Sequence, residues 1–384
     1  MVAMKRYLTS YIKHDLDKKI VLVTGPRQCG KTTLSHQLFP EHDYFNYDSA
    51  DDRLALKEKN WDREKALVVF DEVHKMPQWK RWLKGIYDTE GVHPKILVTG
   101  SAKLDTYRKA GDSLAGRYFQ YRLHPIDLKE AITFYPEHSP EVIFDRLLSC
   151  SGFPEPFLEG DRIFYQRWRH THLDIILRQD LLDIQAVRDI QAIETLVALL
   201  KRRVGSTVSY ANLARDLERD ANTVKRWLLL LENLYVIFRV TPYHKDITRS
   251  LLKEPKFYFY DTAQVIGNEG VQFENLVACA LLKELHFIED TKGTNTKLHF
   301  LRTKDGKEID FLIAMEDVPT AMIEVKWSDA TPSSGFQHFQ KFLPNIQAIQ
   351  LVKNLDRNKT YPNGLTVRAA IPWLAEMTDI SSCI

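Results

Sequence analysis

Short runs of apolar residues alternate with charged, helix-like stretches along the first third of the chain. Three of these runs read as buried strands, and each leads into Gly, Asp or Ser: Ile20–Val23, Ala66–Phe70 and Lys95–Val98. Continuous apolar runs are typical of strands that are covered on both faces, and their alternation with helices is typical of a parallel sheet. The pattern therefore predicts an α/β fold with a parallel sheet between layers of helices.

The rest of the chain falls into three further regions. Residues 128–195 have a helical pattern with a Gly- and Pro-containing loop, and residues 209–240 contain two short helices followed by an apolar ribbon. Strands and helices return after residue 250, with strands expected at 257–260 and near His299, Ile309 and Met322, and a helix over 272–285. We predict four domains, with the ranges 1–127, 128–195, 196–249 and 250–384.

Composition narrows the classes of protein. The 53 Lys and Arg nearly balance the 51 Asp and Glu, which gives a net charge of +2, so any nucleic-acid surface must be local. Hydrophobic residues make up 44% of the 384, which is too many for a disordered chain. The four cysteines form no CxxC pair, the first 19 residues contain no signal-peptide core, and no apolar run reaches the ~20 residues of a membrane span. We expect a soluble, cytoplasmic protein.

The stretch after the first predicted strand matches the phosphate-binding pattern GxxxxGK[ST]. It reads Gly25-Pro26-Arg27-Gln28-Cys29-Gly30-Lys31-Thr32, and a helical stretch from Thr33 follows it. A strand before the motif and a helix after it separate such a loop from a chance glycine run. Backbone N–H groups would surround phosphate oxygens, Lys31 would reach the β- and γ-phosphates, and the Thr32 hydroxyl would bind Mg²⁺. Residues 25–33 are therefore predicted to bind ATP with Mg²⁺.

The second predicted strand ends in two acids. Asp71 is expected to hold Mg²⁺, directly or through water, and Glu72 to polarise the attacking water. The third strand ends in small polar residues, of which Thr99 or Ser101 is a candidate sensor of the γ-phosphate; a simple polar strand end is the alternative. The pattern predicts an ATP hydrolase in which Lys31 and Glu72 are catalytic.

Several motifs resemble those of prokaryotic AAA-superfamily ATPases that carry a C-terminal domain of uncharacterised function. They are Gly25–Thr32, Asp71-Glu72, Gly100-Ser101, Leu114–Arg117, Gly152–Glu155 and Phe257–Thr262. The resemblance implies that Arg117 is a catalytic arginine finger or γ-phosphate sensor; an arginine paired with a carboxylate of its own domain is the alternative. A finger acting on a neighbour requires a homo-oligomer. The chain departs from the family at Ala263, where glycine is usual, so Asp261 either has a functional role or only ends a strand.

Residues 209–240 match the pattern of a winged helix. The second helix of such a unit inserts its N-terminal residues into the DNA major groove, and here they are Asn222, Thr223, Lys225 and Arg226. Residues 201–250 contain ten Lys or Arg and five Asp or Glu, a local balance of +5. DNA is the expected partner. Packing within the protein or against another subunit is the alternative.

Two neighbouring strands near the C-terminus carry a nuclease-like arrangement. Thirteen residues separate Asp310 from Glu324-x-Lys326, and Glu274 lies on the preceding helix. Residues two apart on a strand share a face, so Glu324 and Lys326 point the same way. Asp310 and Glu324 would bind Mg²⁺ or Mn²⁺, with Lys326 and Glu274 assisting. The resemblance implies a restriction-endonuclease-like fold; an exposed Glu–Lys pair, or a DNA-binding domain without cleavage, is the alternative.

These features together predict an ATPase that couples its nucleotide state to DNA through a winged helix and a nuclease-like domain. Two other functions stay open. One is a signalling switch whose hydrolysis is controlled by a protein partner. The other is a metal-dependent nuclease that the ATPase regulates.

Overall fold

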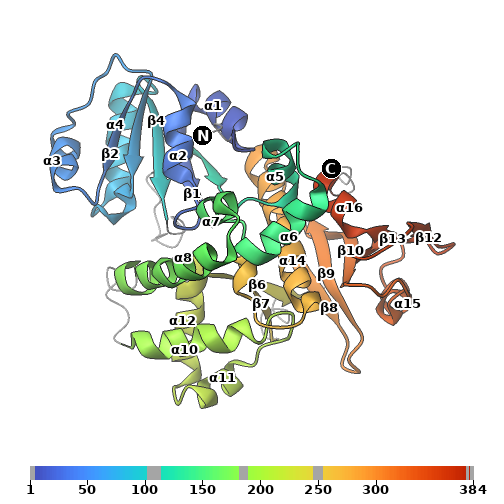
Figure 1. Ribbon diagram of the computed structural model, residues 1–384. Helices are drawn as coiled ribbons and strands as arrows, with labels where there is room; N and C mark the ends of the chain where they lie inside the picture. The colour runs from blue at the N-terminus through green and yellow to red at the C-terminus, as the bar shows by residue number, and fades with distance from the viewer. Residues whose placement is uncertain (1–4, 102–113, 181–188, 245–253, 378–379, 381–384) are drawn as a thin grey trace. The chain divides into compact units, whose positions relative to one another are not determined.

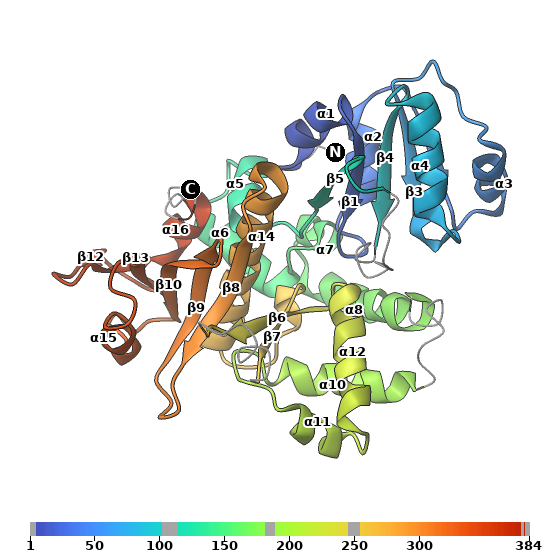
Figure 2. The same ribbon diagram turned by 180° about the vertical axis from the view of Figure 1, so that it is seen from behind.

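The chain divides into two compact units (Figures 1 and 2). In the computed structural model the described residues are 5–101, 114–180, 189–244, 254–377 and 380. The first unit consists of Met1–His124 with Asn233–Tyr235, and the second of Pro125–Glu232 with Val236–Ile384. The first division lies close to the predicted boundary at 127, whereas the predicted boundaries at 195 and 249 fall inside the second unit.

The first unit is built on a sheet of five parallel strands in the order β2-β3-β4-β1-β5. The strands are β1 (Ile20–Thr24), β2 (His42–Asn46), β3 (Leu67–Asp71), β4 (Lys95–Gly100) and β5 (Tyr118–Arg122). The helices are α1 (Thr9–Leu16), α2 (Lys31–Leu38), α3 (Ala50–Glu58), η1 (Val73–Lys75) and α4 (Trp79–Glu90). The predicted parallel sheet is confirmed, and its three apolar runs are β1, β3 and β4.

Helices cover both faces of this sheet (Figures 1 and 2). On one face, Leu83 and Ile86 of α4 pack with Leu22, Phe70 and Val98, which come from three neighbouring strands. On the other face lie α1 and α2, which contact β4. Burial on both faces explains why these strands appear in the sequence as continuous apolar runs.

The second unit is built on a mixed sheet of eight strands in the order β12-β13-β11-β10-β9-β8-β6-β7. Their bounds are β6 (Ile237–Pro242), β7 (Lys256–Phe259), β8 (Thr296–Arg302), β9 (Glu308–Met315), β10 (Val318–Lys326), β11 (Gln347–Val352), β12 (Lys359–Thr360) and β13 (Leu365–Ala369). Strands β8, β9 and β10 are antiparallel neighbours, whereas β10, β11 and β13 run parallel. The strands expected near 299, 309 and 322 are β8, β9 and β10.

Helices of the second unit pack on this sheet and on one another. They are α5 (Leu128–Phe134), α6 (Pro140–Cys150), α7 (Pro154–Glu159), α8 (Arg162–Ile175), η3 (Ile176–Asp180), α10 (Ile190–Lys201), α11 (Tyr210–Asp216), α12 (Ala221–Asn233), η4 (Thr262–Gln264), α14 (Glu269–Lys292), α15 (Ser334–Phe339) and α16 (Ala370–Glu376). Helix α14 contacts β7, β8 and β10, and α16 contacts β11, β13, α5 and α6. None of the described helices has the length and apolar character that a membrane crossing requires.

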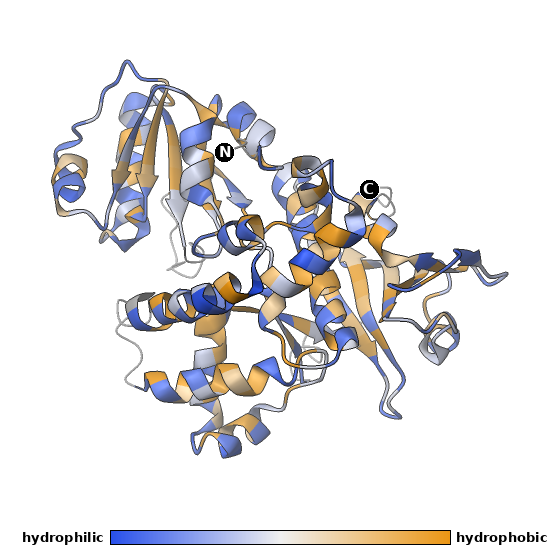
Figure 3. Cartoon of the chain, in the orientation of Figure 1, coloured by the Kyte–Doolittle hydropathy of each residue, from blue (hydrophilic) through white to orange (hydrophobic). Residues whose placement is uncertain are grey.

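The apolar ribbon that was expected to begin a wing is β6, which belongs to the large sheet. It pairs antiparallel with β7 and parallel with β8. Strands from both sides of the predicted boundary at 249 therefore share one sheet. The physical reason is that β6 is mostly buried and apolar, and an apolar strand is compatible with either partner; Figure 3 shows that other central strands of the sheet are hydrophobic too.

Candidate functional site

The loop between β1 and α2 contains the predicted phosphate-binding motif. Gly30 precedes α2 with φ +95°, a left-handed conformation that favours glycine. A Cβ atom at Gly25 would lie 2.2 Å from the carbonyl oxygen of Leu123, so that position has no room for a side chain. Lys31 is buried, and its Nζ donates to the carbonyl oxygens of Gly25 (2.9 Å) and Pro26 (2.7 Å). The lysine thus bridges its own loop.

The buried side chain of Arg6 also hydrogen-bonds to this loop. Its guanidinium donates to the carbonyl oxygens of Cys29 (2.7 Å) and His124 (2.6 Å), and the residue is only 4% exposed. The other motif residues differ in exposure: Gln28, Thr32 and Thr33 are exposed, Arg27 is partly exposed and Cys29 is buried. Arg6 therefore joins the motif to the segment after β5 and holds the loop backbone in place.

Asp71, at the end of β3, accepts three side-chain hydrogen bonds. Its Oδ1 accepts from Thr99 Oγ1 (2.5 Å), and its Oδ2 accepts from Thr32 Oγ1 (3.4 Å) and from the Tyr44 hydroxyl. Burial, with the charge of Asp71, raises the pKa of Tyr44, so its hydroxyl remains a donor. A hydroxyl and a carboxylate are the oxygen ligands that Mg²⁺ prefers, so the donor set at Thr32 and Asp71 fits a magnesium nucleotide.

Glu72 follows Asp71 directly and has a left-handed backbone, with φ +54°. Its Oε1 accepts from the Ser101 N–H (3.1 Å) and its Oε2 from the Ser101 Oγ (3.3 Å). The side chain is 13% exposed. Burial raises the pKa of the Glu72 carboxyl, and the positive charge of Lys31 opposes that rise. A carboxyl with a raised pKa is suited to accept a proton.

Arg117 does not join this site in its own chain. Strands β1 and β5 are parallel, with Ile20 beside Tyr118 and Thr24 beside Arg122. Arg117 therefore lies at the sheet edge opposite the phosphate-binding loop, about 16 Å away at ~3.3 Å per strand residue. Its Nε donates to Asp88 Oδ1 of α4 at 2.8 Å. The expectation that Arg117 completes its own chain's site is not met; a role in a neighbouring copy stays a prediction.

The Arg117→Ala variant separates the two possibilities. Because the Asp88 pair is exposed and remote from the loop, ATP hydrolysis by dilute protein should stay within about twofold of wild type. The measurement is the hydrolysis rate per chain against protein concentration. A finger acting on a neighbour would make the wild-type rate rise with concentration while the variant's does not. A tenfold loss of the hydrolysis rate in dilute protein would instead show that Arg117 acts in the nucleotide site of its own chain.

The four predicted DNA-binding residues lie at the start of α12, on its solvent side. Val224, Trp227 and Leu228 are buried, whereas Asn222, Lys225 and Arg226 are exposed. Thr223 is half-buried and is held by Asp220, whose carboxylate accepts from the Thr223 N–H (2.9 Å) and hydroxyl (2.5 Å). Arg226 Nη2 in turn donates to the Thr223 hydroxyl (3.0 Å).

Several cations that raise the local charge of 201–250 are already paired. Arg203 pairs with Asp216 at 2.7 Å, Arg219 pairs with Asp189, and Arg239 lies 3.5 Å from Glu232. Two more of the counted cations, at positions 245 and 249, lie outside the described residues. The positive surface available to a phosphate backbone is therefore smaller than the count of charges predicts.

The predicted nuclease-like residues come together, but around a lysine. Lys256 of β7 is 1% exposed at its side chain, and its Nζ lies 2.5 Å from Glu308 Oε1, 3.4 Å from Glu274 Oε1 and 3.7 Å from Asp310 Oδ1. Burial lowers the pKa of Lys256, but the charges of Glu274, Asp310 and Glu308 outweigh burial and leave the pKa above its ordinary value. A fixed ammonium group thus lies among the carboxylates.

The other acids of this cluster are tied to the protein. Asp310 Oδ2 accepts from the Val325 N–H (2.9 Å), and Glu324 Oε1 pairs with Lys326 Nζ (2.7 Å). Burial raises the pKa of Asp310 well above its ordinary value, and it also raises that of Glu324. Among the described residues, no group of three or more His, Cys, Asp or Glu is arranged to hold a metal ion. Ammonium groups of Lys256 and Lys326 thus lie beside the acids for which a metal ion was predicted, and the metal-binding role of Asp310 and Glu324 stays a prediction.

Two of the residues in these sites carried no local signal in the sequence, and a third carried a weak one. Arg6 and Tyr44 reach the site from elements outside every motif, through contacts that no spacing encodes. Lys256 had a weak signal: with Tyr258, whose hydroxyl donates to Glu274 Oε1 (2.7 Å), it forms a polar pair two residues apart on an apolar strand.

Three family models match successive parts of the chain. Residues 17–132 match a model described as "AAA domain". Residues 142–267 and 269–373 match models described as "Domain of unknown function", DUF8612 and DUF4143. Together with the parallel sheet, the first match makes the N-terminal unit an AAA-type P-loop domain. This fold implies nucleotide binding, usually with Mg²⁺, and supports ATPase activity in general.

Relatives that match most of the chain are uncharacterized proteins. One from Mycobacterium tuberculosis is 26% identical over 368 residues, which cover 92% of this chain and 80% of the relative. One from Haemophilus influenzae is 22% identical over 412 residues, covering 98% and 99%. Among solved structures, a RuvB variant from Thermotoga maritima is 15% identical with a TM-score of 0.34, covering 62% of this chain and 88% of that one. The replication initiator DnaA bound to AMPPCP and single-stranded DNA is 17% identical with a TM-score of 0.32, covering 58% and 86%. TM-scores this low do not establish a shared fold.

Proposed function

We propose that the protein binds ATP with Mg²⁺, hydrolyses it, and couples the nucleotide state to DNA. One observation carries the ATPase part: the phosphate-binding loop and the two acids after β3 form a single hydrogen-bonded edge, with Thr32 joined to Asp71 and Ser101 joined to Glu72. Ligands of parallel α/β sheets bind at this carboxyl edge. Residues 25–33, Asp71 and Ser101 are the proposed nucleotide-binding set.

Each side chain then has a definable task. Lys31 exchanges the carbonyl oxygens of its own loop for phosphate oxygens, which offer a full negative charge. Thr32 and Asp71 hold Mg²⁺, which neutralises phosphate charge when bound. Glu72 orients water and takes up its proton, and Ser101 fixes the orientation of the Glu72 carboxylate.

The test of the whole proposal is steady-state ATP hydrolysis with Mg²⁺, without DNA and then with single-stranded, duplex and four-way-junction DNA at low salt. We expect at least about tenfold stimulation by one form of DNA. The stimulation should fall steeply as salt is raised, because phosphate contacts release counterions. If ATP is hydrolysed but no form of DNA changes the rate, the protein is an ATPase and the proposed coupling to DNA is refuted. If ATP is not hydrolysed in any condition, both parts of the proposal are refuted.

Replacing Glu72 by glutamine should preserve ATP binding and lower the hydrolysis rate about a hundredfold, because the amide keeps the shape but cannot accept the proton. Wild-type hydrolysis should fall on acidification at a higher pH than an ordinary glutamate would give, since burial raises the pKa of Glu72 and protonation removes the base. The matched control is Glu64→Gln, at an exposed position of the same unit. Wild-type turnover by Glu72→Gln would refute this role.

The DNA part of the proposal is supported by α12. Its N-terminal residues Asn222, Lys225 and Arg226 are exposed while the opposite face is buried, which is the arrangement that a groove-reading helix requires. The hydrogen bonds among Asp220, Thr223 and Arg226 hold the first turn of the helix in one conformation. Thr223→Ala and Lys225→Ala are the substitutions that would reduce stimulation without touching the nucleotide site.

A second function, a switch controlled by a protein partner, is favoured by the ion pairs of the same region. Arg203, Arg219 and Arg239 are paired with carboxylates of the protein, so they are less available to DNA phosphates. Such a protein would hydrolyse ATP at a rate that is insensitive to salt and indifferent to every form of DNA. The hydrolysis measurement above distinguishes the two functions directly.

A further inference from the structure

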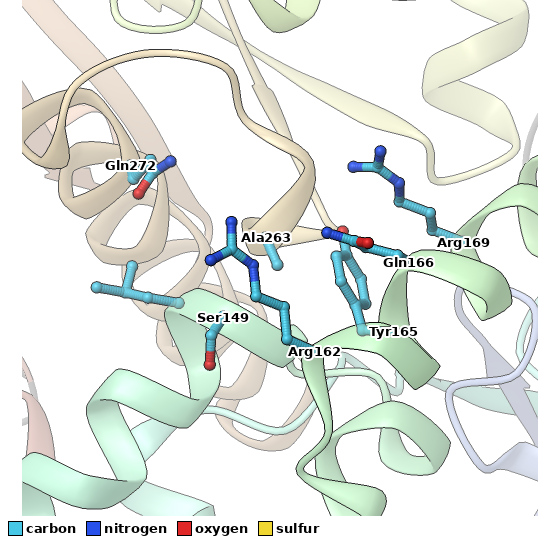
Figure 4. Close-up of a pocket in the computed structure, with 8 residues that line it drawn as sticks. Ser149, Arg162, Tyr165, Gln166, Arg169, Ala263 and Gln272 are labelled. Atoms are coloured by element: carbon cyan, nitrogen blue, oxygen red, sulfur yellow. The ribbon is translucent and has the colours of Figure 1, made fainter.

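A pocket of about 210 Å³ lies within the second unit, against one side of α8 (Figure 4). Helix α8 contributes Arg162, Tyr165, Gln166 and Arg169 to its wall. Gln272 of α14 and Ser149 of α6 contribute further polar groups. No residue used in the proposed nucleotide site or in the α12 surface lines it, and no Asp or Glu does.

The two arginines give the pocket a positive charge. They are seven residues apart, or about 10.5 Å along the helix axis, and Figure 4 shows both guanidinium groups extending from α8 toward the same side. Among the described residues, neither arginine forms an ion pair; Arg169 lies over the Tyr165 ring, 6.0 Å from its centroid. Five other arginines of this unit lie within 4 Å of a carboxylate: Arg178, Arg203, Arg219, Arg239 and Arg302. Arg162 is exposed and Arg169 is half-buried, so two guanidinium groups without a carboxylate partner among the described residues lie on one wall of a pocket that has no acid in its lining, and this arrangement favours an anion.

A buried acid, Asp261, contacts the pocket residue Tyr165. Asp261 is 5% exposed, and both of its carboxylate oxygens accept from the Tyr165 hydroxyl, at 3.1 and 3.0 Å. Asp261 Oδ1 also accepts from the Ala263 N–H at 3.3 Å. Burial raises the pKa of Tyr165 well above its ordinary value, so the phenol stays neutral and covers the carboxylate. Asp261 thus holds Tyr165 in place on the pocket wall.

We propose that this pocket binds an oxyanion of the phosphate class between Arg162 and Arg169. Guanidinium groups match phosphate oxygens with paired hydrogen bonds, and the amides of Gln166 and Gln272 can add neutral donors. The volume corresponds to about seven water molecules, which accommodates a phosphate or pyrophosphate group but not a folded macromolecule. The phosphate can belong to a small molecule or to the backbone of a nucleic-acid strand that passes over the pocket. The proposal does not depend on ATP hydrolysis at the other unit.

The experiment is done on the full chain with Lys31→Ala, so that the phosphate-binding loop does not contribute. Pyrophosphate binding is measured by titration calorimetry, and binding of a fluorescein-labelled twelve-residue oligothymidine, which has no terminal phosphate, by anisotropy at low salt. The test variants are Arg162→Gln and Arg169→Gln. The control is Arg167→Gln, on the same helix at an exposed position that does not line the pocket.

We expect each pocket variant to weaken binding at least tenfold and Arg167→Gln to stay within twofold. Loss of pyrophosphate binding would identify a small phosphate as the source, and loss of oligonucleotide binding alone would identify a strand backbone. Gln166→Glu, which adds a negative charge at an exposed position, should weaken binding as well and guards against a folding defect of the arginine variants. The proposal would be overturned if all four variants bound as tightly as the parent protein. It would also be overturned if Arg167→Gln weakened binding as much as the pocket variants do.

Discussion

Replacing Lys31 by alanine should remove ATP binding and hydrolysis together and lower kcat/KM about a thousandfold. Lys31 is buried, so its charge acts where water screens it weakly. The substitution also removes the bonds from Nζ to the carbonyl oxygens of Gly25 and Pro26, which close the empty loop. The measurements are direct binding of a fluorescent ATP analogue and steady-state hydrolysis with Mg²⁺.

The control for this substitution is Lys57→Ala, at an exposed position on α3 of the same unit. It removes an equal charge without touching the loop and should behave as wild type. Because Arg6 still holds the Cys29 carbonyl, we expect Lys31→Ala to remain folded, with a melting temperature close to wild type. Near-wild-type affinity for ATP in the folded variant would show that the nucleotide binds elsewhere.

The arrangement of the proposed nucleotide site could be predicted because its parts are local in the sequence. A buried strand, a glycine loop and a helix lie within twenty residues, and the sheet brings the end of β3 beside the end of β4, so that Asp71 pairs with Thr99. Tyr44 and Arg6 escaped prediction because only the folded sheet brings them near Asp71 and Cys29. The position of Arg117 could not be predicted for a related reason: only its place before β5 shows at which edge of the sheet it lies.

The second unit was harder to predict, since an apolar strand does not reveal its neighbours. The β6 strand has the composition of a wing strand, yet it pairs with β8 as well as β7. The acids at 274, 310 and 324 were expected to lie near one another, and the structure also places Lys256 beside two of them, Glu274 and Asp310. A lone lysine on a strand reads as a surface residue, and only its burial shows otherwise.

Replacing Lys256 by methionine should destabilise the second unit by about 3–5 kcal/mol, the usual effect of leaving buried charges without their partner. Glu274, Glu308 and Asp310 all lose the ammonium group that they share. The loss should be larger at pH 8 than at pH 5, because burial already raises the pKa of Asp310 and its protonation in the variant relieves the repulsion. Urea unfolding at the two pH values measures both effects.

Lys307→Met is the matched control, because Lys307 is a largely exposed lysine of the same unit, beside Glu308 in the sequence. It should change the free energy of unfolding by less than about 1 kcal/mol. Adding Glu274→Gln to Lys256→Met should restore part of the lost stability, since one uncompensated charge is then removed. If Lys256→Met is as stable as wild type and gains affinity for Mg²⁺ or Mn²⁺, the lysine would be blocking a metal site. Equal loss at both pH values would show that packing, rather than charge, sets the effect.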